Sequence, residues 1–191
     1  MDQPVAVDDL PAEPWRNGRG ITRTVAVDAG AGDWRWRISL ADLSGTAPFS
    51  RFAGVDRQAV LVRGSGLVLT VDGVSSQLAA AGQRLDFAGE SDVWAATPGG
   101  AARLWNVMTR RGRARAELCW LQDSATLPAG GVRVLLAMDA GCRVRAGRRV
   151  LTLAPGCCWT PPGDVALEVA AGDGGGLLVT RVAVAEGLTP S

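Results

Sequence analysis

The sequence contains no histidine and no tyrosine, and all 20 of its basic residues are arginine, so lysine is absent as well. Histidine is the usual general base near neutral pH and the commonest metal ligand. Lysine forms Schiff bases and binds phosphate in ordinary P-loops. These absences argue against most hydrolase triads, most zinc and iron sites, pyridoxal chemistry and nucleotide phosphate loops. The carboxylates, arginines, cysteines and hydroxyl groups that remain suit recognition of an anion better than proton transfer.

Charge and hydropathy limit the choice of partners. The 20 arginines nearly balance 19 acidic residues, which leaves a formal net charge of +1 and gives no reason to expect binding to nucleic acid or to a membrane. The N-terminus has no basic segment followed by an apolar one, so no signal peptide is expected. The apolar stretch Leu177–Val184 is too short to span a bilayer and contains Arg181. We therefore expect a cytoplasmic protein.

The four cysteines, Cys119, Cys142, Cys157 and Cys158, show no C-x-x-C spacing. In a reducing cytoplasm such residues are usually small buried hydrophobic side chains, and we expect the same here. With no histidine beside them they do not indicate a metal site. The sequence therefore predicts neither a metal nor any other cofactor.

Short β-strand patterns dominate, and 25 glycines and 10 prolines interrupt the chain at close intervals. Between Trp34 and Ala41, apolar residues alternate with arginine and serine, which is the period of a strand. Asp72-Gly73 follows two apolar runs and predicts a hairpin turn. The other candidate strands are Gln58–Arg63, Leu67–Val71, Arg103–Met108, Ala116–Leu121, Val132–Met138, Cys142–Ala146, Arg149–Leu153, Val165–Ala170 and Leu177–Val184.

An internal repeat appears when the chain is shifted by 74 residues, which aligns Val60–Val62 with Val134–Leu136. The same shift aligns Gly73, Gly82 and Gly89 with Gly147, Gly156 and Gly163. Turn glycines are what two copies of one β-fold would share. We predict an all-β fold of two tandem jelly-roll barrels that resemble the cupin barrel. The expected domains are residues 1–112 and 113–191, and strands could be exchanged across the junction. Typical cupins hold a metal with histidines, which this chain lacks.

The first half contains ordered motifs: PWRNGRGITR at residues 14–23, WRIS at 36–39, PFSRFAGVDR at 48–57 and LWNVMTRR at 104–111. Their order and spacing resemble the HutD/Ves family. The resemblance implies a cytoplasmic bacterial bicupin. HutD-type members are associated with histidine utilisation and are thought to restrain that pathway by sensing an intermediate, for which N-formylglutamate or urocanate is suspected. Ves-type members are tied to stress and cold responses. The resemblance brings no established enzymatic activity.

The chain departs from the family pattern at three positions. Arg19 replaces a glycine of the motif, Thr24 stands where glutamate is common, and Ala47 stands where glycine is usual. Arg19 places bulk and charge in a loop whose backbone should be tight. Its side chain could narrow the mouth of a pocket or add a contact to an anion.

Arg57 is the first candidate for a ligand contact, because the planar guanidinium group pairs bidentately with a carboxylate. Its open alternative is a structural ion pair at the start of a strand. Arg37 and Ser39 share one face of a strand, which either lines the barrel or is solvated. Asn17 and Thr22 are expected in a glycine-rich loop, and Asn106 is either a ligand contact or a buried structural amide. Phe49, Phe52 and Met108 would form an apolar wall, although the two phenylalanines also suit a core or a lid.

We therefore predict a metal-independent binding protein for a small carboxylate, with a regulatory role, and favour binding over catalysis. The pocket is expected in the first barrel, while the second barrel would serve as scaffold or as the surface of a homodimer. One alternative is a metal-independent isomerase or hydrolase of an acidic or formylated metabolite, with Asp56 as acid or base. Another is a structural or stress-related partner protein.

Overall fold

The computed structural model describes residues 3–15, 17–28, 33–172 and 176–185, which form four antiparallel β-sheets and one short 3-10 turn, η1 (Val7–Asp9). The predicted all-β fold is confirmed. The chain divides into two compact units, one of Pro11–Arg113 and the other joining the described parts of Met1–Leu10 and Ala114–Ser191. Within the described ranges no helix is long and apolar enough to cross a membrane.

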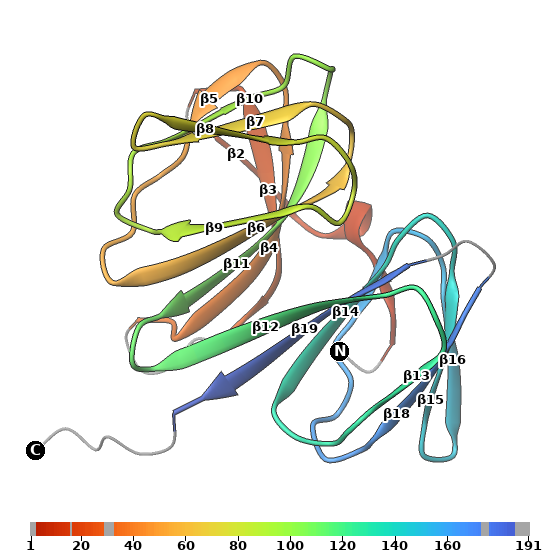
Figure 1. Cartoon of the computed structure of the whole chain (residues 1–191). Helices are drawn as coiled ribbons and strands as arrows, with labels where there is room; N and C mark the ends of the chain where they lie inside the picture. The colour runs from red at the N-terminus through yellow and green to blue at the C-terminus, as the bar shows by residue number, and fades with distance from the viewer. Residues whose placement is uncertain (1–2, 16, 29–32, 173–175, 186–191) are drawn as a thin grey trace, which may run out of the picture. The chain divides into compact units, whose positions relative to one another are not determined.

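The first unit is a barrel of two sheets (Figure 1). Its six-stranded sheet has the order β2-β3-β4-β11-β6-β9 and its four-stranded sheet the order β5-β10-β7-β8. The strands of the larger sheet are β2 (Ala12–Pro14), β3 (Gly20–Val27), β4 (Trp36–Leu43), β11 (Ala102–Arg110), β6 (Val55–Arg63) and β9 (Arg84–Ala88). Those of the smaller sheet are β5 (Thr46–Pro48), β10 (Val93–Ala96), β7 (Leu67–Val71) and β8 (Val74–Leu78).

The second unit also consists of two sheets, with the orders β1-β17-β14-β19-β12 and β13-β18-β15-β16. The strands of the first sheet are β1 (Val5–Ala6), β17 (Cys157–Trp159), β14 (Val132–Ala137), β19 (Leu177–Val184) and β12 (Ala114–Leu121). Those of the other are β13 (Ala125–Leu127), β18 (Leu167–Ala171), β15 (Cys142–Ala146) and β16 (Arg149–Leu153).

The N-terminal segment belongs to the second unit, although the sequence-based boundaries assigned it to residues 1–112. β1 pairs with β17, with Val5 opposite Cys158. The Val7 N–H group also donates a hydrogen bond of 3.0 Å to the Gly156 carbonyl. A two-residue strand of this kind leaves no periodic pattern, so the sequence could not show which barrel it would join.

The internal repeat corresponds to matching structural elements. β6, β7 and β8 are followed 74 residues later by β14, β15 and β16, within one residue at most strand ends. Asp72 and Gly73 both have positive φ, at 48° and 84°, which is what a two-residue type I′ hairpin requires. Gly147, the repeat partner of Gly73, also has positive φ, at 59°. The predicted hairpin is therefore present, and the shared glycines mark turns common to both barrels.

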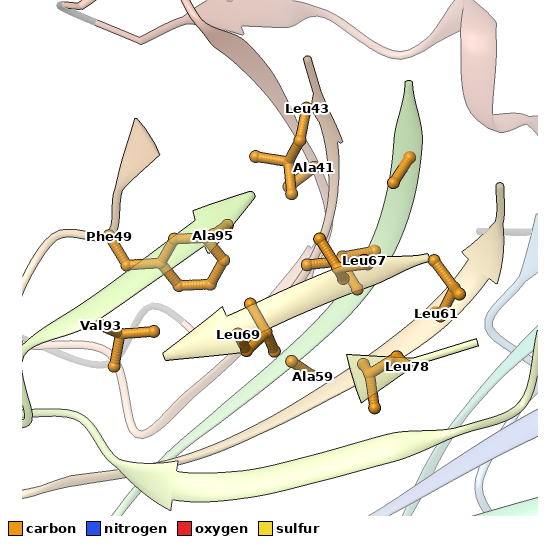
Figure 2. Close-up of a cluster of buried hydrophobic side chains, with 12 residues drawn as sticks. Ala41, Leu43, Phe49, Ala59, Leu61, Leu67, Leu69, Leu78, Val93 and Ala95 are labelled. Carbon is orange, nitrogen blue, oxygen red and sulfur yellow. The ribbon is translucent and has the colours of Figure 1, made fainter. Parts of the chain in front are cut away.

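The core of the first barrel lies between its two sheets (Figure 2). Ala41, Leu61 and Leu104 come from the larger sheet, and Leu67 and Leu69 from the smaller one. These side chains are at most 1% exposed, so they contribute the full hydrophobic free energy of burial. The second unit has a separate apolar cluster that includes Leu135, Leu153 and Trp159.

The expectation that all cysteines are buried is wrong at Cys119, which is exposed on the edge strand β12. Cys142 and Cys158 are buried, and Cys157 is half-buried. Burial raises the pKa of Cys142 and Cys158 to about 11, so these thiols are protonated and unreactive at neutral pH. None of the four cysteines forms a disulfide.

We expect Leu69→Ala to lower the free energy of unfolding by about 2–5 kcal/mol, because Leu69 is fully buried and the substitution leaves a cavity. The matched control is Val74→Ala on the neighbouring strand β8. Val74 is 69% exposed, and its truncation should change stability by less than about 0.5 kcal/mol. Urea titration followed by tryptophan fluorescence measures both values. Equal losses for the two variants would contradict this description of the core.

Candidate functional site

The register of the larger sheet places polar residues from three strands side by side on its inner face. Met108 of β11 lies opposite Arg37 of β4 and opposite Arg57 of β6. Paired residues of neighbouring antiparallel strands project to the same face, so the three side chains form one row. Two residues along each strand, Ser39 and Asn106 form the next row.

The following row on this face is apolar and belongs to the core, with Ala41, Leu104 and Leu61 opposite one another. The inner face therefore changes from charged to apolar within four residues of each strand. Such a gradient closes one end of the barrel with hydrophobic side chains and leaves a polar hollow towards the other end.

A cavity of about 530 Å³ lies over the polar rows, within the usual size range of small-molecule sites. All the residues predicted as ligand contacts line it, so the structure brings the predicted set together in one place. The complete lining is Glu13, Pro14, Trp15, Asn17, Thr22, Arg37, Ser39, Pro48, Phe49, Ser50, Phe52, Arg57, Asn106 and Met108.

Arg57 is 6% exposed and has few hydrogen-bond acceptors. It donates to the Ser50 carbonyl at 3.1 Å and to Asn106 Oδ1 at 3.2 Å, while its Nε is buried without a partner. Its guanidinium carbon lies 4.9 Å from the ring centre of Phe49 and 5.1 Å from that of Phe87. Among the described residues no carboxylate forms an ion pair with it, so the structural ion pair left open above is not present.

Burial, and secondly the positive charge of Arg37, lowers the pKa of Arg57 from its usual range to about 10. The group still carries its charge at neutral pH. The surroundings disfavour this charge, because no anion among the described residues replaces the lost hydration.

Arg133 in the second unit shows what a buried structural arginine looks like in the same chain. It is fully buried and donates to three backbone carbonyls: Pro128 at 3.0 Å, and Pro162 and Val165 at 2.6 Å each. These bonds tie three chain segments together. Arg57 has one such carbonyl partner, at a longer distance, and lines a cavity instead.

Arg37 and Ser39 face the cavity, so the solvated-face alternative is wrong for them. Ser39 is 4% exposed, and Arg37 donates to Thr24 Oγ1 at 2.8 Å. On the opposite face of β4, Trp36 and Ile38 are buried as well. Both faces of this strand are therefore covered, which a simple alternation of polar and apolar residues did not reveal.

The segment around Trp15 forms the rim of the cavity. Thr22 lies within strand β3 rather than in the predicted loop, and its Oγ1 accepts a hydrogen bond of 2.8 Å from Trp15 Nε1. The Trp15 ring meets the Phe49 ring edge-on at 5.8 Å between centroids. A Cβ at Gly20 would lie 2.9 Å from the same indole ring, so this position needs glycine.

Two polar residues of the glycine-rich segment have other roles. Asn17 Oδ1 accepts a hydrogen bond of 3.0 Å from the Arg19 backbone N–H, so its carbonyl serves the loop and its NH₂ group is left for the cavity. Arg19 is exposed and is not part of the cavity lining. Its guanidinium lies near Gly45, so neither expected effect of Arg19 on the pocket is seen.

Asp56, the candidate acid or base, lies outside the cavity lining because it alternates with Arg57 along β6. Its carboxylate is 2.6 Å from Arg111 Nε, and Arg111 also binds Glu90 at 2.6 Å. The side chain of Asp56 is 61% exposed. The structure thus contradicts its assignment as a group that acts on a ligand in this cavity.

The sequence analysis missed Glu13, Pro14, Trp15, Pro48 and Ser50 in the lining. Pro14, Trp15, Pro48 and Ser50 stood inside the quoted motifs, which was a usable signal. Glu13 lies outside them and had none. Among the described residues Glu13 is the only carboxylate in the lining, and no group of three or more Cys, Asp or Glu residues is placed to hold a metal ion.

A second hollow, of about 570 Å³, lies on the sheet β13-β18-β15-β16. Its walls include the exposed residues Arg143, Arg145 and Val150. Arg145 is exposed and already forms an ion pair with Glu168. It should therefore bind an anion less strongly than Arg57, which is buried and has no carboxylate partner among the described residues. The cavity of the first barrel is the stronger candidate.

Fold and cavity together define a two-barrel cupin protein whose first barrel encloses an arginine-lined pocket. A cupin 2 conserved barrel domain protein from Leptotrichia buccalis shares the fold, with a TM-score of 0.65 over 96% of both chains at 10% identity. The chain belongs to the HutD family, whose model matches residues 7–178.

The similarity to known proteins extends over most of the chain. A 21.2 kDa protein in the hutC 3' region of Pseudomonas putida is 36% identical over 155 residues, covering 79% of this chain and 82% of the relative. Protein Ves of Citrobacter koseri is 31% identical over 152 residues, covering 78% of each. HutD from Pseudomonas fluorescens SBW25 superimposes with a TM-score of 0.82 at 26% identity, covering 96% of this chain and 98% of that one. The family is thereby associated with the histidine-utilisation region.

The two buried arginines should respond differently to replacement by methionine. Arg57→Met should leave the free energy of unfolding of the ligand-free protein unchanged or raise it by about 1–4 kcal/mol, because a desolvated charge is removed. Arg133→Met should lower it by about 3 kcal/mol or more, because three buried carbonyls lose their donor.

Thermal and urea unfolding of both variants against the parent protein measures this contrast. If Arg57→Met destabilises the protein as much as Arg133→Met, Arg57 has a structural role and its assignment to a ligand fails.

Proposed function

We propose that the protein is a metal-independent, cytoplasmic binding protein for small carboxylate metabolites, and that occupancy of its first barrel regulates histidine utilisation. N-formylglutamate and urocanate are the proposed ligands. The observation that carries the proposal is the guanidinium group of Arg57, which is buried, lines a cavity of small-molecule size and has no carboxylate partner among the described residues.

Energetics favour an acid over a neutral ligand at this position. A hydrogen bond to a charged group contributes about 1.5–3 kcal/mol, and about 1.4 kcal/mol is a tenfold change in affinity. In the free protein Arg57 has the Ser50 carbonyl and the Asn106 amide as acceptors, and its Nε has none. A ligand carboxylate would supply the missing anion at a position that water reaches poorly.

The remaining lining suits a small organic acid. Phe49 and Phe52 stack around the Arg57 guanidinium, with Phe52 at 5.9 Å, and Met108 lies next to it in the same row. These groups would pack against a carbon skeleton. Asn17, Thr22 and Ser39 would supply the polar contacts that fix its orientation.

Binding is favoured over catalysis because the cavity offers little acid–base chemistry. Histidine and lysine are absent from the sequence, and Asp56 lies outside the lining. The side chain of Glu13, the lining carboxylate, is 65% exposed. A hydrolytic role would need a base held near the scissile bond.

Isothermal titration calorimetry at neutral pH with N-formylglutamate and with urocanate tests the proposal. We expect at least one to bind the parent protein, and Arg57→Met to weaken that binding about tenfold or more, because the charged contact is lost. Arg51→Gln is the matched control, since Arg51 is exposed, pairs with Asp92 and lies outside the lining. Binding that survives Arg57→Met unchanged would remove Arg57 from the site.

A second measurement separates binding from hydrolysis. We expect no formate to appear when the protein is incubated with N-formylglutamate and the mixture is followed by NMR, because Glu13, the carboxylate among the described lining residues, is largely exposed to solvent. Steady formate production that Glu13→Gln abolishes would replace the binding proposal with the enzymatic one.

A further inference from the structure

A second arginine, Arg37, also lines the cavity and makes no direct contact with Arg57. Arg37 lies on the other side of Met108 in the same row, two strands from Arg57. Neighbouring strands are about 4.8 Å apart, so the two backbone positions are separated by roughly 10 Å. Both side chains line the same cavity, so a single small molecule can contact both.

Arg37 is held weakly by its own protein. Nη2 donates to the neutral Thr24 hydroxyl at 2.8 Å and lies 3.8 Å from Glu13 Oε2, beyond hydrogen-bond distance. The side chain of Glu13 is 65% exposed and that of Arg37 is 23% exposed. No other acceptor binds Arg37 within the described part of the chain, and a guanidinium group has five N–H donors.

Magnitudes decide between Glu13 and a ligand as the partner of Arg37. An exposed ion pair of this kind changes an equilibrium by about onefold to fivefold. A charged hydrogen bond to a well-placed carboxylate contributes roughly tenfold to a hundredfold. A ligand carboxylate would therefore displace Glu13 at little cost.

The two arginines also disfavour each other, since the charge of Arg37 acts on Arg57 across the cavity. One anion placed at Arg57 leaves the Arg37 charge compensated only by the exposed Glu13. Two anions on one ligand would compensate both arginines at once.

We propose that Arg37 forms a second anion subsite, so that the pocket takes a small dicarboxylate lying across Met108 with one carboxylate at Arg57 and the other at Arg37. Glu13 competes for Arg37 and thereby sets how strongly the pocket prefers two negative charges over one. The inference rests on the proposed function, because it needs the first carboxylate at Arg57.

Glutarate and its monoamide, glutaramate, test the second subsite because they share one shape and differ by one charge. We expect glutarate to bind about fivefold to tenfold more tightly than glutaramate at neutral pH, the difference between a charged and a neutral hydrogen bond. Isothermal titration calorimetry gives both dissociation constants, and succinate and adipate show the preferred spacing.

Variants around Arg37 assign the preference to this residue. Arg37→Gln should bring the ratio of the two dissociation constants close to one. Thr24→Glu keeps Arg37 and places a carboxylate beside it, so it should reduce the ratio in the same way. Glu13→Gln should raise the affinity for glutarate up to about fivefold. Arg51→Gln, outside the lining, should leave the ratio as in the parent protein.

The outcomes distinguish the two proposals. If neither acid, nor N-formylglutamate or urocanate, binds, the proposed function fails and this inference fails with it. If both acids bind with equal affinity and both lose it in Arg57→Met, the function stands and the second subsite is refuted. A glutarate preference that survives both Arg37→Gln and Thr24→Glu also refutes it.

Discussion

The burial of the positive charge of Arg57, with no ion-pair partner among the described residues, is the constraint on which this site depends. Arg57 enters the first barrel from strand β6, loses most of its hydration and gains only a carbonyl, an amide and aromatic ring faces. A buried charge of this kind is tolerated only when the surrounding structure contributes enough stability elsewhere. The apolar cluster between the two sheets, including Leu67 and Leu69, provides that stability.

Strand register converts motifs that are far apart in sequence into a single site. Arg37, Arg57 and Met108 belong to three strands whose pairing puts them in one row, and Ser39 and Asn106 form the next. A one-residue slip in any of these strands would turn its side chain to the opposite face. In the next row Ala41, Leu104 and Leu61 belong to the core, so the same strand pairing specifies the site and the core together.

Sequence reasoning predicted much of this fold because its signals are local. Each of these signals depends only on residues that are close in sequence. They are the Asp72-Gly73 turn, the alternation along the strands and the turn glycines that recur after 74 residues. Site residues inside the motifs could be selected by chemical type. Two features needed the three-dimensional pairing: the N-terminal strand β1 joins the second unit, and Glu13 reaches the cavity from a short strand without a pattern. Asp56 was misassigned because adjacent strand residues face opposite ways.

The absence of histidine from this cavity has a physiological consequence. A receptor that uses imidazole groups changes its charge over the range in which cells acidify. The guanidinium group of Arg57 keeps its charge over that range, since even its lowered pKa is about 10. Ligand carboxylates are likewise ionised throughout that range. If the pocket binds a small carboxylate as proposed, the charged contact between Arg57 and that carboxylate would persist over this pH range.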